Sequence, residues 1–336
     1  MKTDLSHRRT DLSRRVPFLL GSAALLVVAA GASLAVGTRP VALVEVWRAL
    51  TDFAGTTDHL VVRDIRLPRT IVGGCVGAAL GVAGVLIQTL TRNPLAEPGI
   101  LGVTAGAGFA INVGVLAGIA GSQAGQLGLA VAGAAVAAVV VHAVGRVSPL
   151  RLILAGVALS WVLMGVSLGL RLSFPDVFDR YRFWSVGTLA GTEQTPLAVP
   201  VLVTVLALAA ALATTGPLNA LALGEDVAHT LGARVTRIRI TVLVLVTVLA
   251  GVATAVAGPI AFVGLMVPHL ARRLATDSIP WIMAYSMLLG PILLIVADIG
   301  SRVLLPTGEV PVSIVTAFLG GPVLIWAVRR YGTAAL

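Results

Sequence analysis

Apolar stretches of about twenty residues recur along the whole chain, and they constrain the fold more than any other feature. Hydrophobic residues make up 57% of the 336 residues and charged residues only 12%, which leaves too little polar surface to solvate a soluble globule. Because a helix of about 20 apolar residues crosses the hydrocarbon core, the sequence predicts an all-α polytopic membrane protein with ten spans, near 16–36, 67–90, 99–119, 124–145, 150–171, 196–214, 238–257, 259–275, 280–301 and 311–328. Glycines interrupt the third stretch, and the eighth is short.

Basic residues are concentrated on one side of this topology. Residues 1–15 are charged and precede an apolar run longer than the core of a signal peptide, so we expect a retained first helix behind a cytosolic tail. An excess of Lys and Arg marks cytoplasmic loops, which predicts cytosolic termini, one transmembrane domain at 16–330 and a tail at 331–336. The inner segments then hold 15 of the 24 basic residues, namely Lys2, Arg8, Arg9, Arg14, Arg15, Arg92, Arg146, Arg151, Arg234, Arg237, Arg239, Arg272, Arg273, Arg329 and Arg330.

Several of the remaining basic residues cluster on the predicted outer face. Arg66 and Arg69 lie in the run DIRLPR at the start of the second span, and Arg302 lies where the ninth span ends on the same face. Such side chains commonly reach out to lipid headgroups and offset nearby acids. A cluster that runs against the charge bias instead favours a binding surface for an acidic partner.

The segment 216–239 is the one strongly polar stretch in the middle of the chain. It is too polar to cross a bilayer, and the topology places it in the cytosol. The sequence contains no GxxxxGK[ST] nucleotide-binding motif. We therefore interpret the segment as a docking element for a separate water-soluble protein that supplies energy, and we expect no enzymatic activity in the chain itself.

A turn rich in Pro and Gly follows the second span, where the pairs Asn93-Pro94 and Pro98-Gly99 break the helix. Irregular backbone at a membrane boundary is tolerated where it is buried in protein or lines water. The turn is therefore part of a gate, part of the docking surface or a plain loop between helices. Its residues of interest are Asn93, Pro94, Leu95, Glu97 and Pro98.

Ionisable residues are scarce within the predicted spans. Only one Cys and five His occur, and Asp298 is the one plausible intramembrane acid, expected to pair with Arg302 one helical turn later. A path for bare metal ions needs such ligands, so we expect no metal site and no cofactor. An apolar path lined by small residues suits a bulky chelate. An ion-driven secondary transporter is the alternative, although it gives segment 216–239 no role.

Three long motifs, in order along the chain, resemble one family. RLPRTIVGGCVGAALGVAGVLIQTLTRNPLAEPGILGVTAGAG, GPIAFVGLMVPHLAR, and ADIGSR followed by GEVPVSIVTAFLGGPVLIWAVRR are similar to the FecCD-type permease subunits of bacterial ABC importers for cobalamin and ferric siderophores. The resemblance covers nearly the whole chain beyond the first 15 or so residues. It implies the type II ABC importer permease fold in the cytoplasmic membrane.

The resemblance also implies partners and roles. It implies two cytosolic ATPases, a second permease subunit of the same or a related chain, an external substrate-binding protein, and membrane lipid rather than nucleic acid. Arg66, Arg69 and Arg302 would face glutamates of the binding protein. A pair of short helices, about 218–223 and 225–231, would seat in the ATPase through Leu223, Gly224, Glu225, Asp226, Ala228, His229, Leu231 and Gly232. The cargo would be a ferric siderophore, haem or cobalamin.

Overall fold

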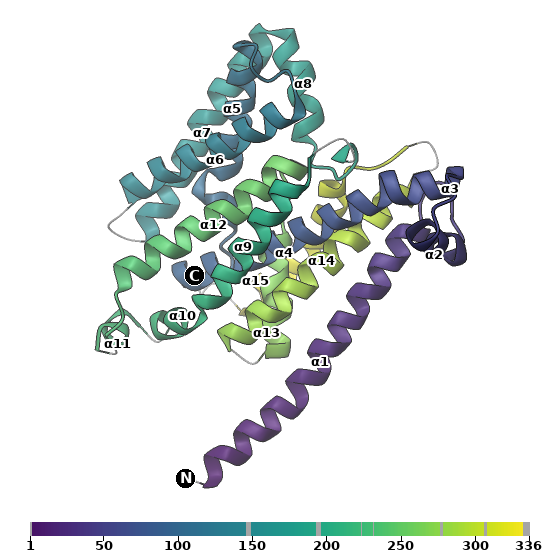
Figure 1. Ribbon diagram of the computed structural model, residues 1–336. Helices are drawn as coiled ribbons and strands as arrows, with labels where there is room; N and C mark the ends of the chain where they lie inside the picture. Colours follow the sequence, from purple (N-terminus) through teal and green to yellow (C-terminus); the bar gives the residue numbers. More distant parts are fainter. Residues whose placement is uncertain are drawn as a thin grey trace.

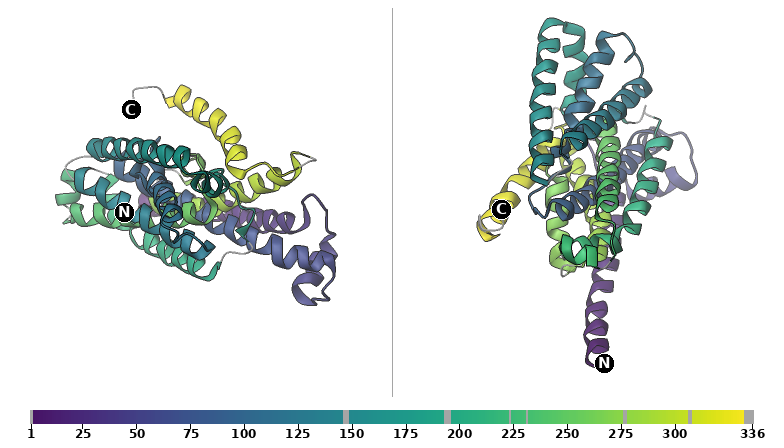
Figure 2. Two further views of the ribbon diagram at one scale, coloured as in Figure 1. Left: turned by 90° about the horizontal axis from the view of Figure 1, so that it is seen from above. Right: turned by 90° about the vertical axis from the view of Figure 1, so that its left-hand side faces the viewer.

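The computed structural model describes residues 2–145, 149–192, 196–222, 224–230, 232–275, 278–305 and 308–331. Over these residues, every regular element is a helix, and the long helices pack side by side in one bundle (Figure 1). The amino-terminal end of α1 projects from one end of the bundle. In Figure 1 and in the right-hand view of Figure 2, α10 lies toward that end and α8 lies at the opposite end.

Each of the ten predicted spans falls on a helix. These helices are α1 (Lys2–Ala35), α4 (Leu67–Thr91), α5 (Val103–Leu116), α6 (Gln123–Gly145), α7 (Pro149–Ser173), α9 (Ala198–Ala213), α12 (Val235–Ala257), α13 (Val263–Ala275), α14 (Ile279–Val303) and α15 (Val312–Tyr331). Within the described residues, six helices are long and apolar enough to cross a membrane, or seven if α9 and α10 (Thr215–Ala222), bent by 50°, form one span. The helices α5, α13 and α15 are shorter than these six candidate spans.

Several short helices were not predicted. They are α2 (Leu43–Thr51), α3 (Thr57–Leu60), the π-helical turn η1 (Val61–Arg66), the 3₁₀ turn η2 (Pro98–Leu101) and α8 (Pro175–Ser185). Each of these is too short or too polar to register as a span. The short helix α11 (Glu225–Thr230) matches the second predicted coupling helix. The chain runs without a break from α3 through η1 into α4, so η1 extends the second span at its amino-terminal end.

The helix α4 lies at the centre of the bundle, where glycines let other backbones approach it. A Cβ atom placed on Gly77 would collide with the backbone of Gly290 in α14, and one on Gly84 would collide with the backbone of Gly264 in α13. Small residues let helix backbones approach closely in this way. These contacts hold α4, α13 and α14 together as the core to which the outer and inner ends attach.

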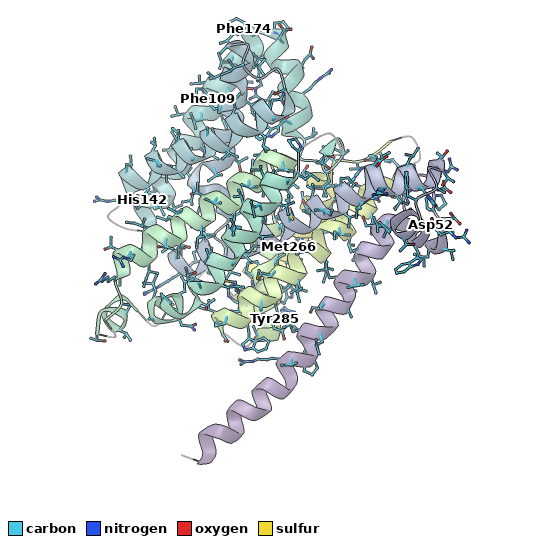
Figure 3. All side chains as sticks on the ribbon, viewed as in Figure 1. Asp52, Phe109, His142, Phe174, Met266 and Tyr285 are labelled. Atoms are coloured by element: carbon cyan, nitrogen blue, oxygen red, sulfur yellow. The ribbon has the colours of Figure 1, made fainter. Side chains whose placement is uncertain are left out.

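The helix α1 lies at the edge of the bundle and packs along α14. Its exposed side chains include Phe18, Val27 and Val28, as expected for a helix that faces lipid. The Tyr285 hydroxyl of α14 donates a hydrogen bond to the Arg15 carbonyl oxygen at 2.7 Å. Figure 3 labels Tyr285 where α14 meets α1, and Asp52 at the far end of α1, next to α2. Tyr285 therefore holds α1 against α14 at Arg15.

Candidate functional site

The three predicted docking arginines come together at the end of the bundle where α4 begins and α14 ends. Arg66 ends η1, Arg69 lies in the first turn of α4, and Arg302 lies in the last turn of α14. Their exposed fractions are only 5%, 4% and 4%. The three side chains are therefore buried, because groups of the chain itself surround them.

Asp298 lies between two of these arginines. Arg69 donates from Nε to Asp298 Oδ1 at 2.8 Å, and Arg302 donates from Nε to Asp298 Oδ2 at 3.0 Å. The predicted pair of Asp298 and Arg302 is confirmed, whereas the bond from Arg69 was not predicted. Asp298 is 1% exposed, and a charge buried to this degree is tolerated only when it is paired and hydrogen-bonded.

A second carboxylate approaches Arg69 from the loop between α14 and α15. Arg69 Nη1 donates to Glu309 Oε2 at 2.7 Å, and the Glu309 side chain is 37% exposed. The Val310 amide donates to the Ser301 carbonyl oxygen at 2.9 Å, which holds the backbone beside Glu309 against α14. Arg69 thus has one deeply buried carboxylate partner and one that reaches the surface.

The other two arginines cap the carboxyl end of α1. Arg302 donates from Nη1 to the Ser33 carbonyl oxygen at 2.8 Å, and Arg66 donates from Nη1 to the Leu34 carbonyl oxygen at 2.8 Å. Arg66 also donates to the Arg39 carbonyl oxygen. The last carbonyls of a helix lack partners inside it and favour cations. The arginine cluster, defined as Arg66, Arg69 and Arg302, therefore joins α1, α4 and α14.

At the opposite end of α4, hydrogen bonds hold the predicted turn after the second span. Arg92 ends α4 in the left-handed conformation, with φ of 52°. The Asn93 side-chain oxygen accepts from the Leu95 amide at 2.8 Å, a short polar turn of the kind Asn favours. Pro94 follows Asn93 directly, and Pro98 begins η2. The turn therefore leads the chain back into the bundle before α5 begins.

Glu97 ties this turn to the start of α13. Its Oε1 accepts from the Phe262 amide at 2.9 Å, and Phe262 has a positive φ of 68°. Burial raises the pKa of Glu97 above its ordinary value, while the Phe262 amide acts in the opposite direction. A cavity of about 200 Å³ lies here, lined by Glu97, Pro98 and Gly264 among others.

The predicted coupling helices are α10 and α11, separated by Gly224 with φ of 125°. Gly232 has φ of 75°, and the Ala233 amide donates to the Ala228 carbonyl oxygen at 2.9 Å. This is a glycine-terminated helix end, so α11 stops at Gly232. Leu223 and Leu231 lie outside the described residues, as do the side chains of Glu225, Asp226 and His229.

Ala228, one of the residues predicted to contact the ATPase, does not face outward from the bundle. It is fully buried within its own chain, whereas Val227 is exposed, because the inner side of α11 packs back on the bundle. One contact also links this segment to the inner turn: Arg92 Nη2 donates to the Leu221 carbonyl oxygen of α10 at 3.0 Å. The coupling segment and the turn are therefore physically connected.

Among the residues that the structure describes, no group of three or more His, Cys, Asp or Glu side chains is placed to hold a metal ion. Titratable groups instead gather at the arginine cluster, where Asp298 and Glu309 pair with Arg69 and Arg302.

The family model of the FecCD transport family matches residues 25–330. The chain is 47% identical over 312 residues to the ferric enterobactin transport system permease protein FepD of Escherichia coli, covering 91% of this chain and 93% of that protein. It is 37% identical over 312 residues to the probable siderophore transport system permease protein YfiZ of Bacillus subtilis, with the same coverage of 91% and 93%.

More distant relatives have the same length and fold. The vitamin B12 import system permease protein BtuC of Salmonella agona is 36% identical over 336 residues, covering 97% of this chain and 99% of that protein. A solved structure described as an inward-facing conformation of an ABC transporter of the metal-chelate type superposes with a TM-score of 0.84 at 29% identity, covering 94% of this chain and 99% of that chain. With a family match across most of its length and relatives that it covers almost end to end, the chain belongs to the FecCD transport family.

Proposed function

We propose that this chain is the membrane-spanning permease subunit of an ATP-driven importer that carries a ferric siderophore across the cytoplasmic membrane. The observation that carries the proposal is the 47% identity, over 91% of the chain, to a permease named for ferric enterobactin transport. Two further relatives are named for siderophore and iron–hydroxamate transport, at 37% and 34% identity. Haem and cobalamin remain the other chelates of the class.

The inner end would receive the ATPase. Its features are α10, α11 and the glycines that end them, together with the contact from Arg92 to Leu221. Two ATPase subunits and a second permease subunit would complete the transporter, with the termini and α10 in the cytosol. Movement of α10 on nucleotide binding would be transmitted through Arg92 to the turn that follows α4. Glu97, in that turn, would transmit the movement to the start of α13.

The outer end would receive an acidic substrate-binding protein at the arginine cluster. The cluster combines three guanidinium groups with two carboxylates, Asp298 and Glu309, and so keeps one net positive charge. A positive site favours association with an acidic surface. Because the arginines are buried, the partner's carboxylates would have to reach into the cluster rather than rest on an open surface.

Copurification tests the assignment of the inner end. A transporter assembled from this chain, its ATPase and its binding protein is compared with one in which residues 225–231 are scrambled. Loss of the ATPase from the scrambled complex, with binding-protein association retained, supports the proposal. Retention of the ATPase in the scrambled complex would contradict it.

A further inference from the structure

Arg69 holds two carboxylates that differ in how readily they can be exchanged. Asp298 is almost fully buried and also accepts two hydrogen bonds from Arg302. Removal of that carboxylate would leave buried guanidinium groups without their counterion, which is strongly unfavourable. Glu309 accepts one hydrogen bond from Arg69 and is partly exposed, and ion pairs of exposed groups contribute little to stability. Only Glu309 can leave at low cost.

From these contacts we infer that Glu309 occupies the position on Arg69 that a carboxylate of the binding protein takes during docking, and that it must be displaced for docking to occur. The inference rests on the proposed docking of an acidic partner at the arginine cluster and deepens it. Glu309 is thus an internal competitor that keeps Arg69 neutralised while no partner is present.

The geometry of the neighbouring arginines supports this assignment. Arg302 uses its guanidinium nitrogens on Asp298, Ser33 and Val36, and Arg66 uses its own on carbonyl oxygens near the end of α1. Among the three, only Arg69 forms an ion pair with a partly exposed carboxylate. An incoming carboxylate can therefore replace Glu309 without breaking the contacts that join α1, α4 and α14.

Exchange of one carboxylate for another leaves Arg69 paired throughout. The Arg69 Nη1 donor is held at 2.7 Å from Glu309 and its Nε donor at 2.8 Å from Asp298, so the guanidinium plane is already oriented by the bond that stays. A preoriented donor loses little freedom when the second partner changes. The partner gains a charge-assisted hydrogen bond, and Glu309 is released into water.

The test measures binding of the transporter's own substrate-binding protein to the assembled transporter in lipid nanodiscs without nucleotide. Three variants are compared: Glu309→Gln, Glu309→Asp and the control Glu45→Gln. Glu45 is a partly exposed acid of α2 that pairs with Arg48, so its substitution removes the same charge without freeing Arg69. Glu309→Asp keeps the charge but draws it away from Arg69 by one methylene.

We expect Glu309→Gln and Glu309→Asp to tighten binding about two- to fivefold, the change that corresponds to losing one weak exposed ion pair, while Glu45→Gln changes nothing. Unchanged or weaker binding by both Glu309 variants would overturn the inference. Equal tightening by Glu309→Gln and Glu45→Gln, with no effect of Glu309→Asp, would also overturn it, since charge alone would then explain the result. Failure of the unaltered transporter to bind its binding protein would instead refute the proposed docking.

Discussion

Arg92 donates from Nη2 to the carbonyl oxygen of Leu221 at 3.0 Å, which joins the end of α4 to the last turn of α10. The two residues are 129 positions apart in sequence. On one side of this contact lies the segment proposed to receive the ATPase, and on the other lies the turn that Glu97 ties to α13. The bond therefore links the segment proposed to receive the ATPase to the end of α4 in the bundle core.

Substitution Arg92→Ala should uncouple ATP hydrolysis from transport. A hydrogen bond to a charged group contributes about 1.5–3 kcal/mol, so its loss should lower uptake roughly tenfold while ATP hydrolysis persists. Uptake and hydrolysis are measured in parallel in proteoliposomes. Arg237→Ala is the control, because it removes an exposed basic residue near the start of α12. Equal uptake per ATP in the Arg92 variant and the control would exclude the coupling role.

Substitution Asp298→Asn should destabilise the protein strongly. It leaves Arg69 and Arg302 buried without their shared carboxylate, and breaking a buried ion pair costs about 3–5 kcal/mol. Asp58→Asn is the matched control, because Asp58 pairs with the exposed Arg39 and such pairs contribute about 0.2–1 kcal/mol. Thermal unfolding in nanodiscs distinguishes the two. Similar small shifts in unfolding temperature for both variants would mean that the arginine cluster does not contribute to the stability of the protein.

Substitution Gly84→Ala should destabilise the bundle, because the new methyl group would meet the backbone of Gly264 and overpacking costs about 1–3 kcal/mol. Gly74→Ala lies on the same helix with no atom within 4 Å of the added Cβ, and there Ala should stabilise the helix by about 0.5–1 kcal/mol. The two variants should thus move the unfolding temperature in opposite directions. Movement in the same direction would show that the α4–α13 contact is looser than described.

The Glu97 carboxyl should make stability depend on pH. Because its pKa is raised in the folded protein, the folded state retains the proton to higher pH than the unfolded state. Its contribution is therefore fully present below the ordinary Glu pKa of about 4.3 and is lost as pH rises through the folded pKa. Glu97→Gln should remove this loss, so that the stability of the variant changes less with pH than the stability of the unaltered protein. An identical pH profile in both would rule out Glu97 as the group responsible.

Hydropathy predicts most of this fold because each span must satisfy its backbone hydrogen bonds internally, as a helix, when it crosses lipid. The bond between Asp298 and Arg302 was also predictable, since the residues lie four apart on one helix. The short helix α2 was missed because its apolar side chains cover only one face of nine residues. A window that averages over about 20 residues cannot detect such a helix.

The partners of the site residues were harder to predict. Arg69 and Glu309 are 240 positions apart, and a single sequence carries no signal for a contact at that separation. Ala228 was expected to contact the ATPase but is buried within its own chain, because tertiary packing decides which side of a short helix is buried. Burial of the arginine cluster depends on carbonyls at the end of α1 and on the loop after α14, which charge patterning does not reveal.

Uptake of ferric enterobactin into proteoliposomes tests the central claim most directly. The vesicles contain this chain, its ATPase and its binding protein, and ferric citrate and cobalamin serve as comparison substrates. We predict that uptake requires ATP on the side of the membrane where the ATPase subunits lie and persists when ionophores collapse the ion gradients. Uptake should be greatest for the ferric siderophore. Uptake that proceeds without the ATPase and stops when the ion gradient is collapsed would contradict the account.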